Sequence, residues 1–273
     1  MQRRASAEIN LACIAHRAAL WVGVWIGLNY AQVDLREQLL RVMDRKNHWA
    51  WPHFAEGRIP LPRLKAHFQQ EWDVYIRDFP ILLARTLGHG PPLKVRNALA
   101  ENIYEEQTGR ISQTAPHPEL FLRMMEGCGF ARSDFEDVSR LGSAAAYRSF
   151  LDRVSWEEPW VVGAAVLTLF VEGSVREREE LGQVSAIPSP AELESAVRMH
   201  PLVRVHGVPL PAMELVRAHK QVEGGHRRDA WEMVLENAAD GGERQVVDAL
   251  NTALALWLRY RDEVAAACGI SRP

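Results

Sequence analysis

Two histidines and a glutamate share one face of an expected helix near residue 220. Within the helix expected over about 211–238, His219, Glu223 and His226 stand at positions i, i+4 and i+7. Side chains at this spacing lie on the same side of an α-helix, and here that side also carries apolar residues such as Leu215. Two imidazoles and a carboxylate that point inward together can converge on one or two metal ions.

A second candidate ligand is Glu172. It follows the apolar run 161–171 and continues its predicted core face. An ionised carboxylate on such a face is costly unless it is paired or binds a cation. Its position just before Gly173 is also compatible with a side chain that simply emerges into solvent.

A third segment combines a carboxylate and a histidine. Glu106 falls on or beside the buried stripe of the helix expected over 93–108, and His117 opens the next expected helix after a break near Gly109. His117 is therefore placed to turn back toward Glu106. Glu105 is expected on the more polar face, and it stays an alternative ligand to Glu106.

Taken one at a time, these residues have ordinary structural explanations, because a buried histidine is usually a hydrogen-bonded core residue. The whole set is more informative: three carboxylates and three imidazoles come from separate helices and lie on or near core faces. Oxygen and nitrogen donors without thiolate suit iron or manganese, and a set of this size suits a pair of ions. The sequence contains no His-Glu-x-x-His motif, which disfavours a zinc metalloprotease.

The elements that must position these residues are helical. Almost every segment past Val33 shows the 3.6-residue apolar period, with breaks at Pro and Gly, and Pro80 is expected to kink or split its helix. No repeat or linker divides the chain, so we predict one all-α domain over residues 33–273. The expected helices lie at about 34–46, 61–88, 93–108, 118–128, 133–140, 143–154, 158–184, 189–199, 211–238 and 242–268.

Residues 1–32 are interpreted as an N-terminal extension, with Val33 as a candidate natural start. The apolar stretch from Ala18 to Leu28 is shorter than the roughly 20 residues of a membrane span, and no signal-peptide cleavage pattern follows it. We therefore expect no membrane association.

Composition excludes several classes of protein. The 273 residues are 47% hydrophobic and 25% charged, which is typical of a globular protein and excludes a disordered or fibrous chain. The net charge of −3 gives no basic surface for nucleic acid. Cys13, Cys128 and Cys268 fit neither a disulfide framework nor a thiolate zinc site, so we predict a reducing, cytoplasmic location.

The motifs together resemble a known superfamily. Asn102-x-x-Glu105-Glu106, then His117-Pro118 after a glycine turn, then Glu172-Gly173 and His219-x-x-x-Glu223-x-x-His226 are similar to the haem-oxygenase-like di-iron oxidases and oxygenases. Fold relatives of that superfamily include the pyrroloquinoline-quinone synthase C and thiaminase II types. The similarity spans about residues 61–240, and the last motif is its most specific part.

The resemblance implies a haem-oxygenase-like helical bundle that binds two irons per chain through three histidines and three carboxylates. Two departures stand out. Members more often have Asp at the position of Glu223, and the turn before His117 is longer than usual, which keeps Glu105 as a possible substitute for Glu106. The matching positions are Glu106, His117, Glu172, His219, Glu223 and His226.

The implied function is a non-haem di-iron oxidase or oxygenase. It would use dioxygen to oxidise a small organic substrate of amine, amino acid or carboxylic acid type, with iron, or alternatively manganese, as metal. A homodimer and an external electron donor are compatible with this function. One alternative is a metal-independent oxidase or hydrolase of the same fold, with His219 and His226 as acid and base. Another is a helical binding protein without catalysis.

Several residues are weaker candidates for substrate contact. Glu71 could add a carboxylate or lie at the surface, and Tyr75 or Tyr104 could take part in radical or proton transfer or simply pack in the core. Arg204 and Arg217 could bind a substrate carboxylate, although most helical arginines are solvated.

Overall fold

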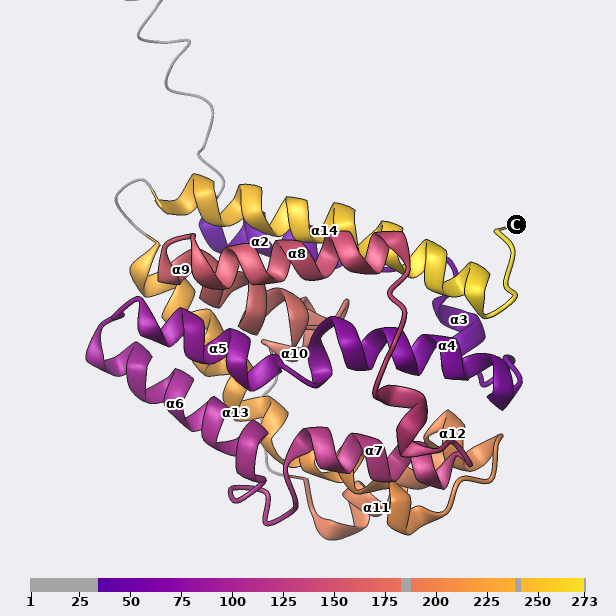
Figure 1. Ribbon diagram of the computed structural model, residues 1–273. Helices are drawn as coiled ribbons and strands as arrows, with labels where there is room; N and C mark the ends of the chain where they lie inside the picture. Colours follow the sequence, from indigo (N-terminus) through magenta and orange to yellow (C-terminus); the bar gives the residue numbers. More distant parts are fainter. Residues whose placement is uncertain (1–33, 183–187, 239–241, 273) are drawn as a thin grey trace, which may run out of the picture.

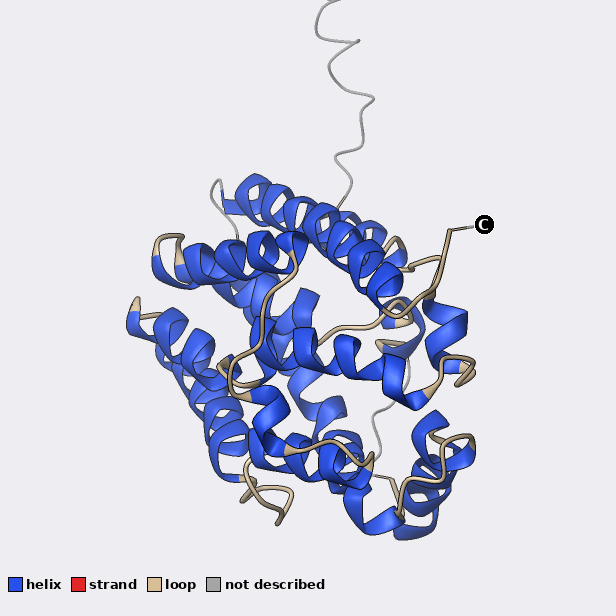
Figure 2. Cartoon of the chain, turned by 45° about the vertical axis from the view of Figure 1, so that its right-hand side comes forward, coloured by secondary structure: helices blue, strands red, loops and turns tan. Residues whose placement is uncertain are grey.

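The 3.6-residue period of the sequence corresponds to helices along the whole described chain. The computed structural model describes residues 34–182, 188–238 and 242–272, without the side chain of Glu223. Within these ranges helices alternate with loops and no strand occurs (Figure 2). The predicted all-α class is confirmed. Residues 1–32 lie outside the described residues, so the proposed start at Val33 stays a prediction.

The helices run as follows (Figure 1). The first part of the chain forms α2 (Leu35–Asp44), α3 (Trp51–Ala55), α4 (Leu61–Glu71), the π-helix η1 (Trp72–Ile76), α5 (Phe79–Gly88), α6 (Leu93–Thr108), α7 (His117–Gly127), the 3₁₀ helix η2 (Arg132–Phe135) and α8 (Gly142–Trp156). The second part forms α9 (Trp160–Ala164), the π-helix η3 (Ala165–Val171), α10 (Glu177–Glu180), α11 (Pro190–Met199), α12 (Pro201–Arg204), the 3₁₀ helix η4 (Leu210–Met213), α13 (Glu214–Asn237) and α14 (Gly242–Ala267).

The segment formed by α9 and η3 is the centre of the bundle. Every residue from 161 to 170 is buried, because this run is apolar on all sides and α5, α8, α13 and α14 pack around it. In Figure 1, α14, α2 and α8 lie together along one side of the molecule, whereas α6, α7 and α13 form the opposite side. The predicted ligands come from this second side and from the end of η3.

Pro80 splits the second expected helix, as predicted. α4 continues into η1, the chain turns at Arg77 and Asp78, and α5 begins with Pro80 in its first turn. Proline is tolerated there because the first backbone N–H groups of a helix have no partner within the helix.

The helix expected over 133–140 is wrong beyond the short η2. Side chains from the preceding helices bind this stretch instead: Gln70 donates to the Ser139 carbonyl at 3.0 Å and accepts from the Leu141 N–H at 3.0 Å. Arg140 forms an ion pair with Asp73. Because these side chains satisfy its polar groups, the segment does not need helical hydrogen bonds.

The helix expected over 158–184 ends early, at Glu172. Gly173 turns sharply there, and a Cβ at this position would lie 2.1 Å from the Leu169 carbonyl oxygen. No bulkier residue fits that approach. The chain then continues into the short α10.

A helix that crosses a membrane must be both long and apolar. None of the helices in the described ranges combines the length and the apolar character needed to cross a membrane.

Candidate metal centre

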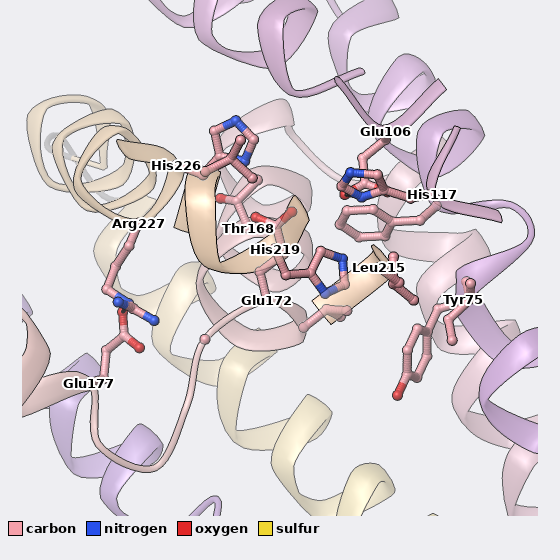
Figure 3. Close-up of a pocket in the computed structure, with 15 residues that line it drawn as sticks. Tyr75, Glu106, His117, Thr168, Glu172, Glu177, Leu215, His219, His226 and Arg227 are labelled. Atoms are coloured by element: carbon pink, nitrogen blue, oxygen red, sulfur yellow. Dashed lines mark hydrogen bonds and ion pairs between the residues drawn. The ribbon is translucent and has the colours of Figure 1, made fainter. Parts of the chain in front are cut away.

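Five of the six predicted ligands line one cavity of about 240 Å³ (Figure 3). Glu106 comes from α6, His117 from the start of α7, and Glu172 from the end of η3, while His219 and His226 both lie on α13. The chain thus brings side chains from four helices to one place. The apolar part of the wall consists of Ile76, Phe79, Val171, Leu215 and Val222.

Three of these residues form a tight cluster. Glu106, His117 and His219 each offer one donor atom, and the three atoms lie within 4.8 Å of one another. The two imidazole rings meet edge to face, with centroids 4.9 Å apart. Donors around one transition-metal ion stand up to about 4 Å apart for bonds of about 2.1 Å. The cluster is therefore close to the geometry that a single cation requires.

His117 lies between two carboxylates. Its Nε2 is 3.1 Å from Glu105 Oε1 and its Nδ1 is 2.9 Å from Glu106 Oε1. Burial alone would lower the pKa of His117, but hydrogen bonds and charges from Glu106 and Glu105 outweigh burial and raise it. In the absence of a cation, a proton on His117 offsets this negative charge.

Glu105 does not face the polar side of α6, so that expectation was wrong. Its side chain is fully buried, and the loop after Gly109 folds over it. The backbone N–H groups of Ile111 and Ser112 donate to Glu105 Oε2 at 2.8 and 3.2 Å, and the Ser112 hydroxyl donates to Oε1. Burial alone would raise the pKa of Glu105. The hydrogen bonds from Ile111, Ser112 and His117 lower it by more, so the net shift is downward.

Glu172 is less buried than the sequence suggested, and its side chain is exposed at the cavity. Its carboxylate accepts hydrogen bonds from Asn102 Nδ2 at 3.1 and 3.4 Å. Asn102 itself is buried, and its Oδ1 has no hydrogen-bond partner among the described residues. The amide thus orients Glu172 with its nitrogen and leaves an acceptor available nearby.

Lys46 fixes the backbone that carries Glu172. Its ammonium group donates to the carbonyls of Phe170, Val171 and Gly173 at 2.5, 3.3 and 2.6 Å. These carbonyls belong to the C-terminal end of η3 and to the turn that follows it, where helical partners run out. Burial lowers the pKa of Lys46 to about 8.

The last two predicted ligands stand further along α13. His226 lines the cavity, and burial lowers its pKa, which favours the neutral imidazole that binds metals. The backbone of Glu223 continues α13 between the two histidines, but its side chain lies outside the described residues.

A family model described as iron-containing redox enzyme matches residues 66–258. The chain belongs to this family. No curated protein matches the chain.

A solved structure agrees in fold. A TenA homologue from Pseudomonas syringae pv. tomato str. DC3000 superposes on this chain with a TM-score of 0.60. The two chains share 15% identity, and the match covers 86% of this chain and 90% of the other. The fold predicted from the resemblance, a haem-oxygenase-like helical bundle, is confirmed.

The donor set of this cavity suits iron. Carboxylates and imidazoles surround the cavity, and the buried carboxylates carry charge that a cation would offset. Cys128 and Cys268 are buried but do not line the cavity, and burial raises the pKa of the Cys128 thiol to about 12. Both remain thiols at neutral pH, which leaves oxygen and nitrogen as the donors.

The weaker candidates fall in different places. Tyr75 lines the cavity and donates a hydrogen bond to Glu71, which is not a surface residue. Tyr104 is 46% exposed. Arg204 is exposed, and Arg217 donates to the Leu210 carbonyl and to Glu194, away from the cavity.

Sequence analysis missed four charged residues near the site: Lys46, Glu177, Arg227 and Arg261. Glu177 is buried at the cavity edge, where it pairs with Arg227 at 3.2 Å and accepts from Trp231 Nε1 at 2.9 Å (Figure 3). Glu177 and Lys46 carried no recognised motif. Arg261, however, interrupts an apolar stripe of α14 that includes Trp257 and Val264, and that interruption was a usable signal.

Proposed function

We propose that this member of the family is a non-haem di-iron oxidase or oxygenase that uses dioxygen to oxidise a small organic substrate. The observation that carries the proposal is the convergence of Glu106, His117 and His219 within 4.8 Å, at a cavity also lined by Glu172 and His226. A cavity of about 240 Å³ has room for a small molecule beside this cluster.

Six residues would hold the metal: Glu106, His117, Glu172, His219, Glu223 and His226. Ferrous iron would supply electrons for dioxygen reduction, which side chains alone cannot deliver; manganese is compatible with the same donors. Between the alternatives Glu105 and Glu106, we assign the ligand role to Glu106. If Glu105 accepts the Nε2 proton, Nδ1 of His117 turns its lone pair toward the side where Glu106 and His219 lie.

Residues around these ligands orient them and keep water away. Glu105 fixes the ring and tautomer of His117, since its own orientation is set by the loop N–H groups of Ile111 and Ser112. Asn102 holds the Glu172 carboxylate, and apolar residues such as Phe79 and Leu215 complete the wall where a substrate would lie. Substrate binding there would exclude water from the reacting atoms.

The test is anaerobic loading with ferrous iron, followed by metal analysis and measurement of dioxygen uptake. We expect about two irons per chain and rapid dioxygen consumption. His219→Ala should lose both while keeping its helical circular dichroism. His89→Ala is the matched control, because His89 is exposed, does not line the cavity, and its ring contacts the Ser155 carbonyl.

Each other outcome points elsewhere. One iron per chain would contradict the paired site. No iron, with activity that depends on His219 and His226, would support the metal-independent acid-base enzyme. Neither iron nor activity would support a binding protein.

A small-molecule substrate and dioxygen are the proposed partners, with an external electron donor where the reaction needs one. A homodimer and a cytoplasmic location are proposed as well.

A further inference from the structure

A second cavity adjoins the proposed metal centre. It has a volume of about 370 Å³ and shares Tyr75, Val171 and Gly173 with the first cavity. The Tyr75 ring borders the metal cavity, while its hydroxyl points away from His117 and His219 (Figure 3) and donates to Glu71 in the second cavity. The two spaces therefore meet at the Tyr75 side chain.

Arg261 is the residue of this second cavity that most needs explaining. It lies on α14 and is 2% exposed. One amino group, Nη1, donates to Glu71 Oε1 at 2.6 Å. Nε and Nη2 are also buried, and neither has a hydrogen-bond partner among the described residues. Buried polar groups are nearly always paired, and an unpaired charged one is costly, so this edge of the guanidinium points to a missing ligand.

The charges around the second cavity balance within the protein, but the hydrogen bonds of Arg261 do not. Among the described residues, Glu71 is the carboxylate that contacts Arg261, and it also accepts from the hydroxyls of Tyr75 and Tyr260. Lys46 lines the same cavity, and its three donors are used by backbone carbonyls. The other charged lining residues pair with neighbours, Arg176 with Glu179 and Glu180 with Arg227, and Arg227 also pairs with Glu177, whose charge acts on Lys46. The unpaired edge of Arg261 is therefore the feature that favours an anionic ligand with two acceptor atoms.

The walls of the second cavity are aromatic. Trp51, Tyr147 and Trp257 line it, and the Arg261 guanidinium stands 5.0 Å from the Trp51 ring centroid and 5.9 Å from that of Trp257. Trp51 is 44% exposed and belongs to the five-residue helix α3. Trp51 therefore covers the guanidinium with a partly exposed ring carried by a short helix.

We propose that this second cavity binds the carboxylate head of a small arylalkanoic acid, whose body passes Tyr75 toward the metal centre. The inference names a substrate class and so rests on the proposed function. The unpaired Nε–H and Nη2–H groups lie on the same side of the planar guanidinium, which matches the two oxygens of a carboxylate. The aromatic rings would stack on the aryl group.

A carboxylate fits better than a phosphate. A phosphate dianion needs more donors than one arginine edge supplies, and Lys46 has none to spare. The cavity therefore suits a singly charged, planar head group.

The experiment uses the full-length, metal-free protein, so that binding is measured independently of iron and dioxygen. Isothermal titration calorimetry would compare 3-phenylpropanoate with the neutral 3-phenylpropanamide and with inorganic phosphate. We expect the acid to bind at least about tenfold more tightly than the amide, and phosphate not to bind. Arg261→Lys, which keeps the charge but removes the fork, should abolish the preference for the acid. Arg153→Lys is the matched control, because neither Arg153 nor its partner Glu158 lines the cavity.

A second measurement avoids the risk that an Arg261 variant fails to fold. A diazirine-bearing phenylpropanoate, photolysed on the unaltered protein, should label peptides that contain Trp51, Tyr147 or Trp257. Equal affinity for acid and amide, or labelling confined to other peptides, would overturn the proposal. Acid binding that persists in Arg261→Lys but disappears in His219→Ala would move the carboxylate to the metal ligands and also overturn it. Normal iron loading combined with any of these results would leave the proposed di-iron function standing.

Discussion

The two adjoining cavities differ in the polar groups that they gather. The first gathers carboxylates and imidazoles, with Glu105 and Glu106 on either side of His117. The second contains the Arg261 guanidinium, whose Nη1 donates to Glu71 and whose Nε and Nη2 have no partner among the described residues. Because buried charges and buried hydrogen-bonding groups need partners, the first cavity favours a cation and the second, as proposed, an anion. The proposed metal and the acidic end of its substrate would then occupy neighbouring spaces.

The largest expected effect comes from removing one charge from the first cavity. Glu106→Gln keeps the shape of the side chain but removes the anionic donor nearest His117. We expect the affinity for ferrous iron, measured under anaerobic conditions, to fall at least about 100-fold, because a direct ligand is lost. Metal titration with a competing chelator measures this. Glu119→Gln, on the outer side of α7, is the control; unchanged iron affinity in Glu106→Gln would break the assignment of the first cavity as a cation site.

Glu105→Gln should have a smaller effect of the same kind. Glu105 acts through His117 rather than as a ligand, so its loss is expected to weaken iron binding by about 10–100-fold. The pKa of His117 in the metal-free protein should also fall, since one of the two carboxylates that raise it is removed. Nuclear magnetic resonance titration of the His117 ring would detect that change. A larger loss of iron than in Glu106→Gln would reverse the assignment of the two residues.

The environment of Lys46 in the second cavity can be tested through the pH dependence of the free energy of unfolding. The pKa of Lys46 is lowered to about 8 in the folded protein, whereas it is about 10.4 in an unfolded chain. Between these values the unfolded state binds the proton and the folded state does not, so the contribution of Lys46 to the free energy of unfolding rises with pH, by at most about 1.4 kcal/mol per pH unit. Urea unfolding at pH 7.5 and 9.5 should show this rise in the unaltered protein. Lys46→Met should lack it, and an identical pH dependence in both proteins would contradict the shifted pKa.

Asn102→Ala is expected to have the smallest effect. It removes the amide that donates to Glu172, but Glu172 is held by its backbone as well. We expect full iron occupancy at saturation, with a loss in affinity of a few-fold, about 1 kcal/mol. Chelator competition measures it, and Asn251→Ala, on the outer part of α14, is the control. A complete loss of iron would mean that Asn102 does more than orient Glu172.

Much of the helical architecture could be predicted from the sequence, because the 3.6-residue apolar period and the residues that begin and end a helix are local features of the chain. The clustering of Glu106, His117 and His219 followed from helix periodicity combined with the cost of burying charge. The burial of Glu105 could not be predicted in this way, since it depends on a loop that folds back and supplies two N–H groups. The early end of the helix at Glu172 depends on the approach of Gly173 to Leu169.

The second cavity could not be predicted from the sequence, for another reason. Lys46, Glu71 and Arg261 come from helices far apart along the chain, and no spacing rule relates them. Arg261 within an apolar stripe indicates that something buried must compensate its charge, but only the packed bundle reveals that Glu71 satisfies one amino group and leaves the other edge without a partner.

The π-helical turn of η3 has a consequence for how the chain can change. A π-turn holds one residue more than an α-turn, and each residue of an α-helix rotates the following side chains by about 100°. Deleting one residue from 165–171 would let the segment relax to an ordinary helix and would leave Glu172 facing the histidines, so an iron count of the shortened protein should be unchanged. If the full segment wound as an α-helix instead, Glu172 would rotate away from the histidines by about 100°. The orientation of this carboxylate is therefore set by the π-helical winding of the residues that precede it, and not by its chemistry alone.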